Sequence, residues 1–194
     1  MSSVSAEDED LGARIDYSSL KPGLKRFPSF IERYTTQYFH TTEQCEDEWV
    51  CQHSNKLILV GIAPTHPILS DAGRSVSKVD FAASGSRERS LLDMKVSGKG
   101  KKGGVWMQRD TAICEVTMSD GAVYKVRACV RGMLIEVNAR LAEDPGLLQR
   151  KPNTEGYVAI LRPKLEEADS VAKGLKTRDE YCALRGVPPS ATTN

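Results

Sequence analysis

The sequence has few aromatic residues, no long hydrophobic run and no ordered pattern of cysteines. Phe, Trp and Tyr make up 6% of its 194 residues, and no stretch approaches the roughly 20 apolar residues that span a bilayer. The acidic N-terminal segment has neither the apolar core of a signal peptide nor the Arg-rich composition of a transit peptide. Five cysteines without framework spacing indicate reduced thiols. We therefore expect a soluble intracellular protein that has no membrane partner.

Charge and motifs exclude further classes. The formal net charge is +1, whereas general nucleic-acid binders are strongly basic, so direct nucleic-acid contact is not expected. The sequence contains no GxSxG motif and no Ser, Cys or His set with a recognisable catalytic spacing. Glu115 and Glu136 lie on predicted strands without any sign that they form an acid/base pair. We expect no enzyme.

The sequence also offers no clear metal or cofactor site. Cys45, Cys51, His53 and His66 match no zinc signature, although Cys51 and His53 would share a face of a strand. The glycine- and lysine-rich segment 98–104 lacks the GxxxxGK[ST] order of a phosphate-binding loop. We interpret it as an exposed basic turn.

The chain length suits one domain with tails. We predict a disordered acidic arm over residues 1–27, a folded domain over 28–185 and a disordered tail over 186–194. Ser29 and Glu32 have capping-box spacing, and Ile31, Tyr34 and Tyr38 recur at helical spacing, which predicts a helix here.

Residues 119–163 carry the strongest pattern. Asp120-Gly121 predicts a hairpin with a type I′ turn, and the next residues alternate between two faces. The face that we expect to be buried comprises Tyr124, Val126, Ala128 and Val130, and the opposite face comprises Lys125, Arg127, Cys129 and Arg131. Gly132 then indicates a close approach of two backbones.

Most other segments also predict β-structure. Strands are expected at residues 49–53, 56–62, 79–82, 91–96, 133–137 and 157–161, with a loop at 84–90, a short helix from Asp144-Pro145 and a capped helix from Thr177. The fold class is therefore mainly β.

The order of these parts resembles biotinyl/lipoyl carrier domains, and most closely the H-protein of the glycine cleavage system. The residues that carry the resemblance are Lys101-Lys102-Gly103, Val130-Arg131-Gly132, Glu136-Val137-Asn138 and Glu155-Gly156-Tyr157. The resemblance implies a barrel-sandwich hybrid with short flanking helices and disordered termini. In such carriers a lysine at the hairpin tip bears the cofactor. Gly121 occupies that position here, and Lys125 lies farther along the strand, so we expect no cofactor.

The chain as a whole is similar to the Abitram family, also called Simiate. The matching segments include Glu32-Arg33-Tyr34, Cys45-Glu46-Asp47, Gln52-His53-Ser54-Asn55, His66-Pro67, Val96-Ser97-Gly98-Lys99, Cys129-Val130-Arg131-Gly132 and Thr154-Glu155-Gly156-Tyr157. The resemblance implies a non-enzymatic protein that binds actin, regulates its polymerisation and filopodia, and is linked to transcription. It further implies residence in nuclear speckles, the cytoplasm and cell projections such as the lamellipodium, growth cone and dendrite.

Actin presents an acidic surface, so lysine and arginine are the expected contacts. The first candidate set is Lys95, Lys99, Lys101 and Lys102, and the second is Arg162, Lys164, Lys173 and Lys176. Two alternatives stay open: a carrier or accessory subunit of a lipoate- or biotin-dependent complex, and a scaffold for which actin is a secondary partner.

Overall fold

A computed structural model of the chain describes residues 33–71, 73–83, 86–94 and 103–188. The chain divides into two compact units, Met1–Tyr34 and Thr35–Asn194. In the first unit the Arg33 guanidinium lies 5.4 Å from the centroid of the Tyr34 ring. All of the strands that the structure describes belong to the second unit.

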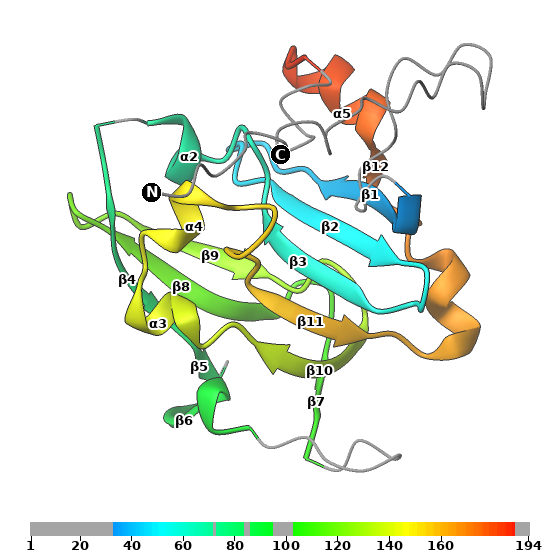
Figure 1. The fold of residues 1–194 in the computed structure, drawn as a ribbon, viewed down its shortest axis with the longest axis horizontal. Coiled ribbons are helices and arrows are strands. Elements are labelled where there is room, and N and C mark those ends of the chain that lie inside the picture. The colour runs from blue at the N-terminus through cyan, green and yellow to red at the C-terminus, as the bar shows by residue number, and fades with distance from the viewer. Residues whose placement is uncertain (1–32, 72, 84–85, 95–102, 189–194) are drawn as a thin grey trace, which may run out of the picture. The chain divides into compact units, whose positions relative to one another are not determined.

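The larger of its sheets has seven antiparallel strands (Figure 1). In spatial order they are β12 (Lys176–Thr177), β1 (Thr35–His40), β2 (Glu48–His53), β3 (Ile58–Ile62), β11 (Ala159–Arg162), β10 (Gly132–Val137) and β7 (Val105–Met107). Sequence-adjacent strands form the hairpins β1–β2 and β2–β3, while β11 returns from the C-terminal half to pair with β3. The two halves of the sequence therefore meet in one sheet.

A second sheet has three antiparallel strands, in the order β4 (Val76–Asp80), β8 (Ala112–Met118) and β9 (Val123–Arg127). β5 (Ala82–Ala83) and β6 (Ser86–Ser90) form a separate hairpin. One core cluster contains buried residues of both sheets, including Val60 and Leu161 from the larger and Val116 and Val126 from the smaller. The two sheets thus share a core, which confirms the predicted mainly β sandwich.

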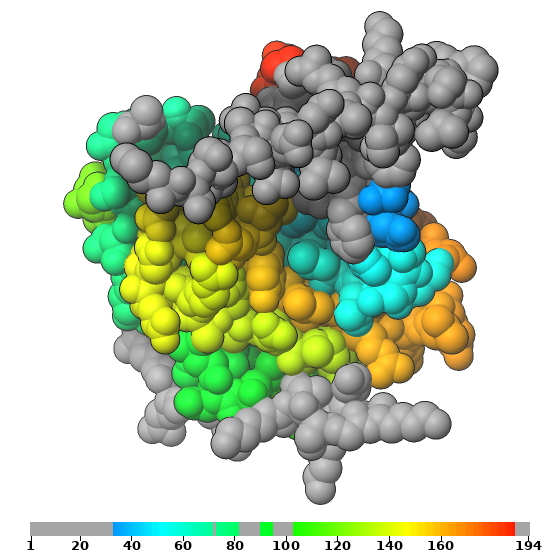
Figure 2. Space-filling model, viewed as in Figure 1, coloured from blue at the N-terminus to red at the C-terminus, as the bar shows by residue number. Residues whose placement is uncertain are grey.

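The helices of the second unit are short, and all but α5, which follows the last strand, lie between strands. They are α2 (Pro67–Ser70), α3 (Arg140–Glu143), α4 (Leu147–Arg150) and α5 (Arg178–Arg185), with 3-10 turns η2 (Leu91–Asp93) and η3 (Leu165–Ser170). In Figure 2 the residues of α3 and α4, coloured yellow, form part of the visible surface. The predicted capping box of α5 is confirmed, because Thr177 and Glu180 bond each other's backbone N–H groups. Among the described residues, no helix is long and apolar enough to cross a membrane.

Three local predictions are wrong. Tyr34 is helical as predicted, but Tyr38 lies in strand β1, because all of residues 35–40 pair with β2 and that pairing outweighs the helical spacing. The predicted loop at 84–90 contains β6, which pairs with β5. The predicted strand at 91–96 begins instead with η2, whose first turn Ser90 caps through its hydroxyl. Residues 95–96, Ser29 and Ile31 lie outside the described residues.

Two further predictions need adjustment. Asp120 does not have a positive φ, so the hairpin turn is not type I′. Instead the Gly121 N–H donates to the Met118 carbonyl and Gly121 alone has a φ of 86°, the geometry of a three-residue hairpin loop with a bulge. The short helix expected from Asp144-Pro145 begins at Leu147.

Candidate functional site

The tip of the β8–β9 hairpin, where a carrier domain holds its cofactor, has no amine to which one could be attached. Gly121 is exposed, and a Cβ built on it would meet nothing within 4 Å. The space for a side chain is therefore present while the side chain itself is missing. Lys125 lies in β9 opposite Glu115, 3.6 Å from its carboxylate. It is on the strand and not at the tip.

The hairpin tip is also bound to the body of the domain. Arg74 donates to the Asp120 carboxylate at 3.0 Å and to the Tyr124 hydroxyl at 3.3 Å. The Ala122 backbone N–H, followed by Arg74, lowers the pKa of Asp120 below its ordinary value. The residues at this tip do not fit a lipoyl or biotinyl group, because none of them offers a free lysine amine.

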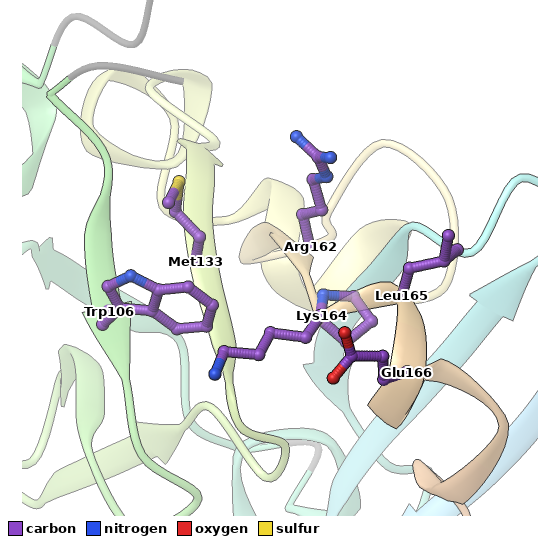
Figure 3. A pocket seen from close by; sticks show the side chains of 7 residues that line it. Trp106, Met133, Arg162, Lys164, Leu165 and Glu166 are labelled. Carbon is purple, nitrogen blue, oxygen red and sulfur yellow. The ribbon is translucent and has the colours of Figure 1, made fainter. Parts of the chain in front are cut away.

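A surface groove, separate from the hairpin tip, lies along β7, β10 and the end of β11. It has a volume of about 370 Å³ and is lined by Trp106, Met133, Arg162, Pro163, Lys164, Leu165 and Glu166. Figure 3 shows Trp106 projecting from β7 on one side and residues 164–166 on the other. The groove combines aromatic, aliphatic and charged side chains at the edge of the larger sheet.

Glycines bring the backbones around the groove close together. A Cβ on Gly132 would lie 3.1 Å from the Arg162 carbonyl oxygen, which confirms the predicted close approach at this residue. A Cβ on Gly104 would lie 2.7 Å from the Met133 sulfur. At Gly132 the nearest atoms are backbone, so the lack of a side chain there sets the spacing of β10 and β11, whereas at Gly104 the nearest atoms belong to the flexible Met133 side chain.

Exposed apolar side chains flank the cations in the groove. Trp106 is 44% exposed and Leu165 is 80% exposed. The Lys164 ammonium lies 5.9 Å from the centroid of the Trp106 ring, within the range of a cation–π contact, and Figure 3 shows the lysine extending toward the indole. The aromatic ring thus holds a lysine at the surface.

The predicted actin-binding residues that the structure describes lie in different parts of the domain. Arg162 and Lys164 line the groove together. Lys176 lies in β12, at the opposite edge of the seven-stranded sheet from β7, and Lys173 is exposed and does not line the groove. The first candidate set, Lys95, Lys99, Lys101 and Lys102, lies outside the described residues. In the sequence, Lys102 precedes β7 by two glycines.

Sequence reasoning missed the apolar part of the groove. Trp106 and Met133 come from separate strands, and Leu165 lies in η3, so no local motif connects them. The sequence signal that could have indicated the groove is Trp106, which follows the lysine-rich turn closely. The set Cys45, Cys51, His53 and His66 is not a cluster of metal-ligating groups among the described residues; His66 is buried and its Nδ1 accepts from the Ile68 N–H at 3.1 Å.

Comparisons with known proteins agree with this architecture. The model of the family "Glycine cleavage H-protein" matches residues 79–185. The crystal structure of a glycine cleavage system H protein from Mycobacterium marinum superposes with a TM-score of 0.54 at 17% identity, covering 77% of this chain and 97% of that one. This structural likeness shows the fold.

Closer relatives carry one common name, Protein Abitram. The relative from Danio rerio is 39% identical over 160 residues, which are 81% of this chain and 89% of the relative. The relative from Homo sapiens is 38% identical over 169 residues, 86% and 92% of the two chains. The relative from Dictyostelium discoideum is 36% identical over 166 residues, 82% and 90%. The chain belongs to the Abitram family, and its residues 79–185 form a domain of the glycine cleavage H-protein family.

Proposed function

We propose that this chain is a non-enzymatic actin-binding protein that regulates actin polymerisation and filopodia and is linked to transcription in nuclear speckles. Membership of the Abitram family supports the proposal, since the family resemblance implies these roles. On the same resemblance we propose residence in the nucleus, the cytoplasm and cell projections, with actin and components of nuclear speckles as partners.

The groove beside β7 is the observation that carries the actin proposal. Arg162 and Lys164 supply positive charge for an acidic filament surface. Trp106 and Leu165 are exposed beside them, and an aromatic residue with an arginine is the usual composition of the energetically important centre of an interface. Direct contact with one partner surface would bury these apolar side chains and pair the cations.

A carrier function is the weaker alternative. It needs a lysine amine at the tip of the β8–β9 hairpin, and the described tip carries Asp120 and Gly121, with Asp120 paired to Arg74. The surface of the domain, and not a swinging arm, is therefore the part that we assign to partner binding.

Neutralising the groove should weaken actin binding. We expect the double variant Arg162→Gln/Lys164→Gln to bind filamentous actin at least about tenfold more weakly than the unchanged chain, because two charge-assisted contacts near 1 kcal/mol each are lost. The salt dependence of binding should also become shallower, since fewer charges take part. Cosedimentation with filamentous actin over a series of salt concentrations measures both quantities.

The matched control is Arg140→Gln/Lys151→Gln. It removes the same two charges from exposed residues that both pair with Glu155, away from the groove lining. We expect its affinity for actin to stay within about twofold of the unchanged chain. An equal loss of actin affinity in both variants would show that the net charge of the chain, and not the groove, determines binding. Unchanged binding by the groove variant, with loss on replacing Lys95, Lys99, Lys101 and Lys102 by Gln, would place the contact in the lysine-rich segment.

A further inference from the structure

Three potential metal ligands converge on one side of the β1–β2 hairpin. His40 ends β1 and Glu48 begins β2, and the two residues face each other as a cross-strand pair. Cys129 reaches the same point from the connection between β9 and β10. The ligand atoms of the three side chains all lie within 4.8 Å of one another, and the His40 Nδ1 is 2.8 Å from the Glu48 Oε2.

The Glu48 carboxylate is held in a fixed orientation. It is fully buried, and its Oε1 accepts from the Arg127 backbone N–H at 3.2 Å and from the Arg127 guanidinium at 3.3 Å. Its other oxygen, Oε2, faces His40. Carboxylates that bind metals are commonly oriented in this way by hydrogen bonds to the second oxygen, so Arg127 leaves Oε2 available as a ligand.

The charge balance suits a divalent cation. A thiolate and a carboxylate neutralise one Zn²⁺ ion, while the imidazole binds as a neutral ligand. The Arg127 charge is shared with a second carboxylate, since Glu46 lies 3.9 Å from the guanidinium. Arg127 therefore contacts two carboxylates, and Glu46 compensates part of the positive charge that it brings to Glu48.

The arrangement does not fit a catalytic triad. In a triad the histidine stands between the nucleophile and the carboxylate. Here the His40 Nδ1 is hydrogen-bonded to Glu48 as in a triad, but the Cys129 thiol donates to the Arg127 carbonyl at 3.4 Å and not to the imidazole. Cys129 is also 1% exposed, too little for attack on a substrate. The three side chains can still serve as ligands of a small ion, because their ligand atoms lie within 4.8 Å of one another.

We propose that His40, Glu48 and Cys129 form a binding site for a single Zn²⁺ ion. Ligand atoms around a tetrahedral zinc ion lie about 3.3–3.7 Å apart, and zinc accepts nitrogen, oxygen and sulfur ligands together. To reach these distances, the ligand atoms that now lie up to 4.8 Å apart must move closer together by roughly 1 Å. The side chain of His40 is 28% exposed, so its ring can move without disturbing the core, and it provides the route by which the ion enters.

Binding releases one proton to solvent. The thiol of Cys129 loses its proton and becomes a thiolate. The proton that lies between the His40 Nδ1 and the Glu48 carboxylate is exchanged through solvent for one on the outward Nε2, so the imidazole stays neutral and the Nδ1 lone pair faces the ion. A solvent water fills the fourth position, as in zinc sites with three protein ligands. This site is separate from the groove beside β7, and the proposal does not depend on actin binding.

Cobalt substitution tests the sulfur ligand directly. The full chain, reduced and stripped with a chelator, is titrated with Co²⁺ and then with Zn²⁺, while absorption and heat are recorded. We expect one ion per chain, a thiolate-to-cobalt charge-transfer band, and displacement of Co²⁺ by Zn²⁺. Cys129→Ser should remove the band, and both Cys129→Ser and His40→Gln should weaken Zn²⁺ binding at least about tenfold.

The matched controls are Cys51→Ser and His53→Gln, which change the same residue types on β2 outside the converging group. Both should retain the band and the Zn²⁺ affinity of the unchanged chain. Zn²⁺ should also raise the melting temperature of the unchanged chain and of the two controls, but not that of Cys129→Ser or His40→Gln. No charge-transfer band, or a band that persists in Cys129→Ser, would overturn the proposal; if Cys129→Ser does not fold, unchanged Zn²⁺ affinity in His40→Gln would overturn it.

Discussion

The variant Arg185→Met should lower the free energy of unfolding by about 3 kcal/mol, because it leaves a buried carboxylate without its counter-ion. Asp47 is fully buried, and Arg185 bonds both of its oxygens, with Nε at 2.7 Å and a terminal nitrogen at 2.8 Å. The same arginine donates to the Thr42 carbonyl at 2.6 Å. Asp47 keeps hydrogen bonds from the Thr42 N–H and the Thr65 hydroxyl, which is why we expect the lower end of the range for a broken buried pair.

This interaction fixes α5 to the larger sheet. Next to it, the ring of Tyr181 stacks on Phe39 with centroids 4.0 Å apart, and the Tyr181 hydroxyl lies 2.6 Å from the Thr65 hydroxyl. Loss of the arginine therefore removes the contacts of α5 with Thr42 and Asp47, which lie between β1 and β2, while the contacts of Tyr181 with Phe39 and Thr65 remain.

Denaturant unfolding of Arg185→Met and Arg140→Met measures the difference. Arg140 pairs with Glu155 at 2.7 Å, but its side chain is 60% exposed, so we expect a loss below about 1 kcal/mol there. The double variant Asp47→Asn/Arg185→Met should recover part of the loss, because no buried charge is then left unpaired. A loss at Arg185 as small as that at Arg140 would show that the buried pair does not hold α5.

Lowering the pH from about 7 to about 5 should reduce the free energy of unfolding by about 2 kcal/mol through His66 alone. Burial lowers the pKa of His66 from 6.5 to about 4; the nearby carboxylates of Glu48 and Asp47 oppose this shift, and the Arg127 charge adds to it. Since Nδ1 accepts from the Ile68 N–H, protonation of the ring would break that hydrogen bond as well.

The sign of the effect follows from the two pKa values of His66. Between pH 6.5 and pH 4 the unfolded chain binds a proton that the folded chain does not. The contribution to stability is therefore complete above pH 6.5 and decreases as the pH falls toward 4. Other groups titrate in the same window, so the effect of His66 must be isolated by comparison.

The comparison uses His66→Asn, whose side-chain oxygen can accept from the Ile68 N–H at the start of α2 as the imidazole nitrogen does. The variant should be less stable than the unchanged chain at pH 7, because a cavity remains. Its loss of stability between pH 7 and pH 5 should be smaller by about 2 kcal/mol. Parallel curves for the two proteins would contradict the lowered pKa.

Local sequence rules predicted the parts of the fold that depend on neighbours in the chain. Trp49 lies in a strand joined to β3 by a tight turn, and Thr177 caps α5, as expected. The predictions were wrong where pairing with distant segments determines the local secondary structure. Tyr38 is in a strand because β2 and β12 pair with β1 on both sides, and pairing of that kind leaves no local pattern.

The site residues show the same difference between local and distant contacts. Gly121 was identified because the hairpin and its tip are local features. The groove joins Trp106 to Lys164 through three strands, and the converging group joins His40 to Cys129. Residues so far apart in sequence meet only through the order of strands in the sheet, which composition and spacing do not specify.

We infer that this domain has the fold of a carrier without a point of attachment for a cofactor. The most direct test of this inference is the intact mass of the chain after co-expression with a lipoate–protein ligase, with a glycine cleavage H-protein in the same cells as the positive control. We expect the H-protein to gain one lipoyl group and this chain to keep its unmodified mass. A lipoyl adduct on Lys125 or on any other lysine of this chain would contradict the claim.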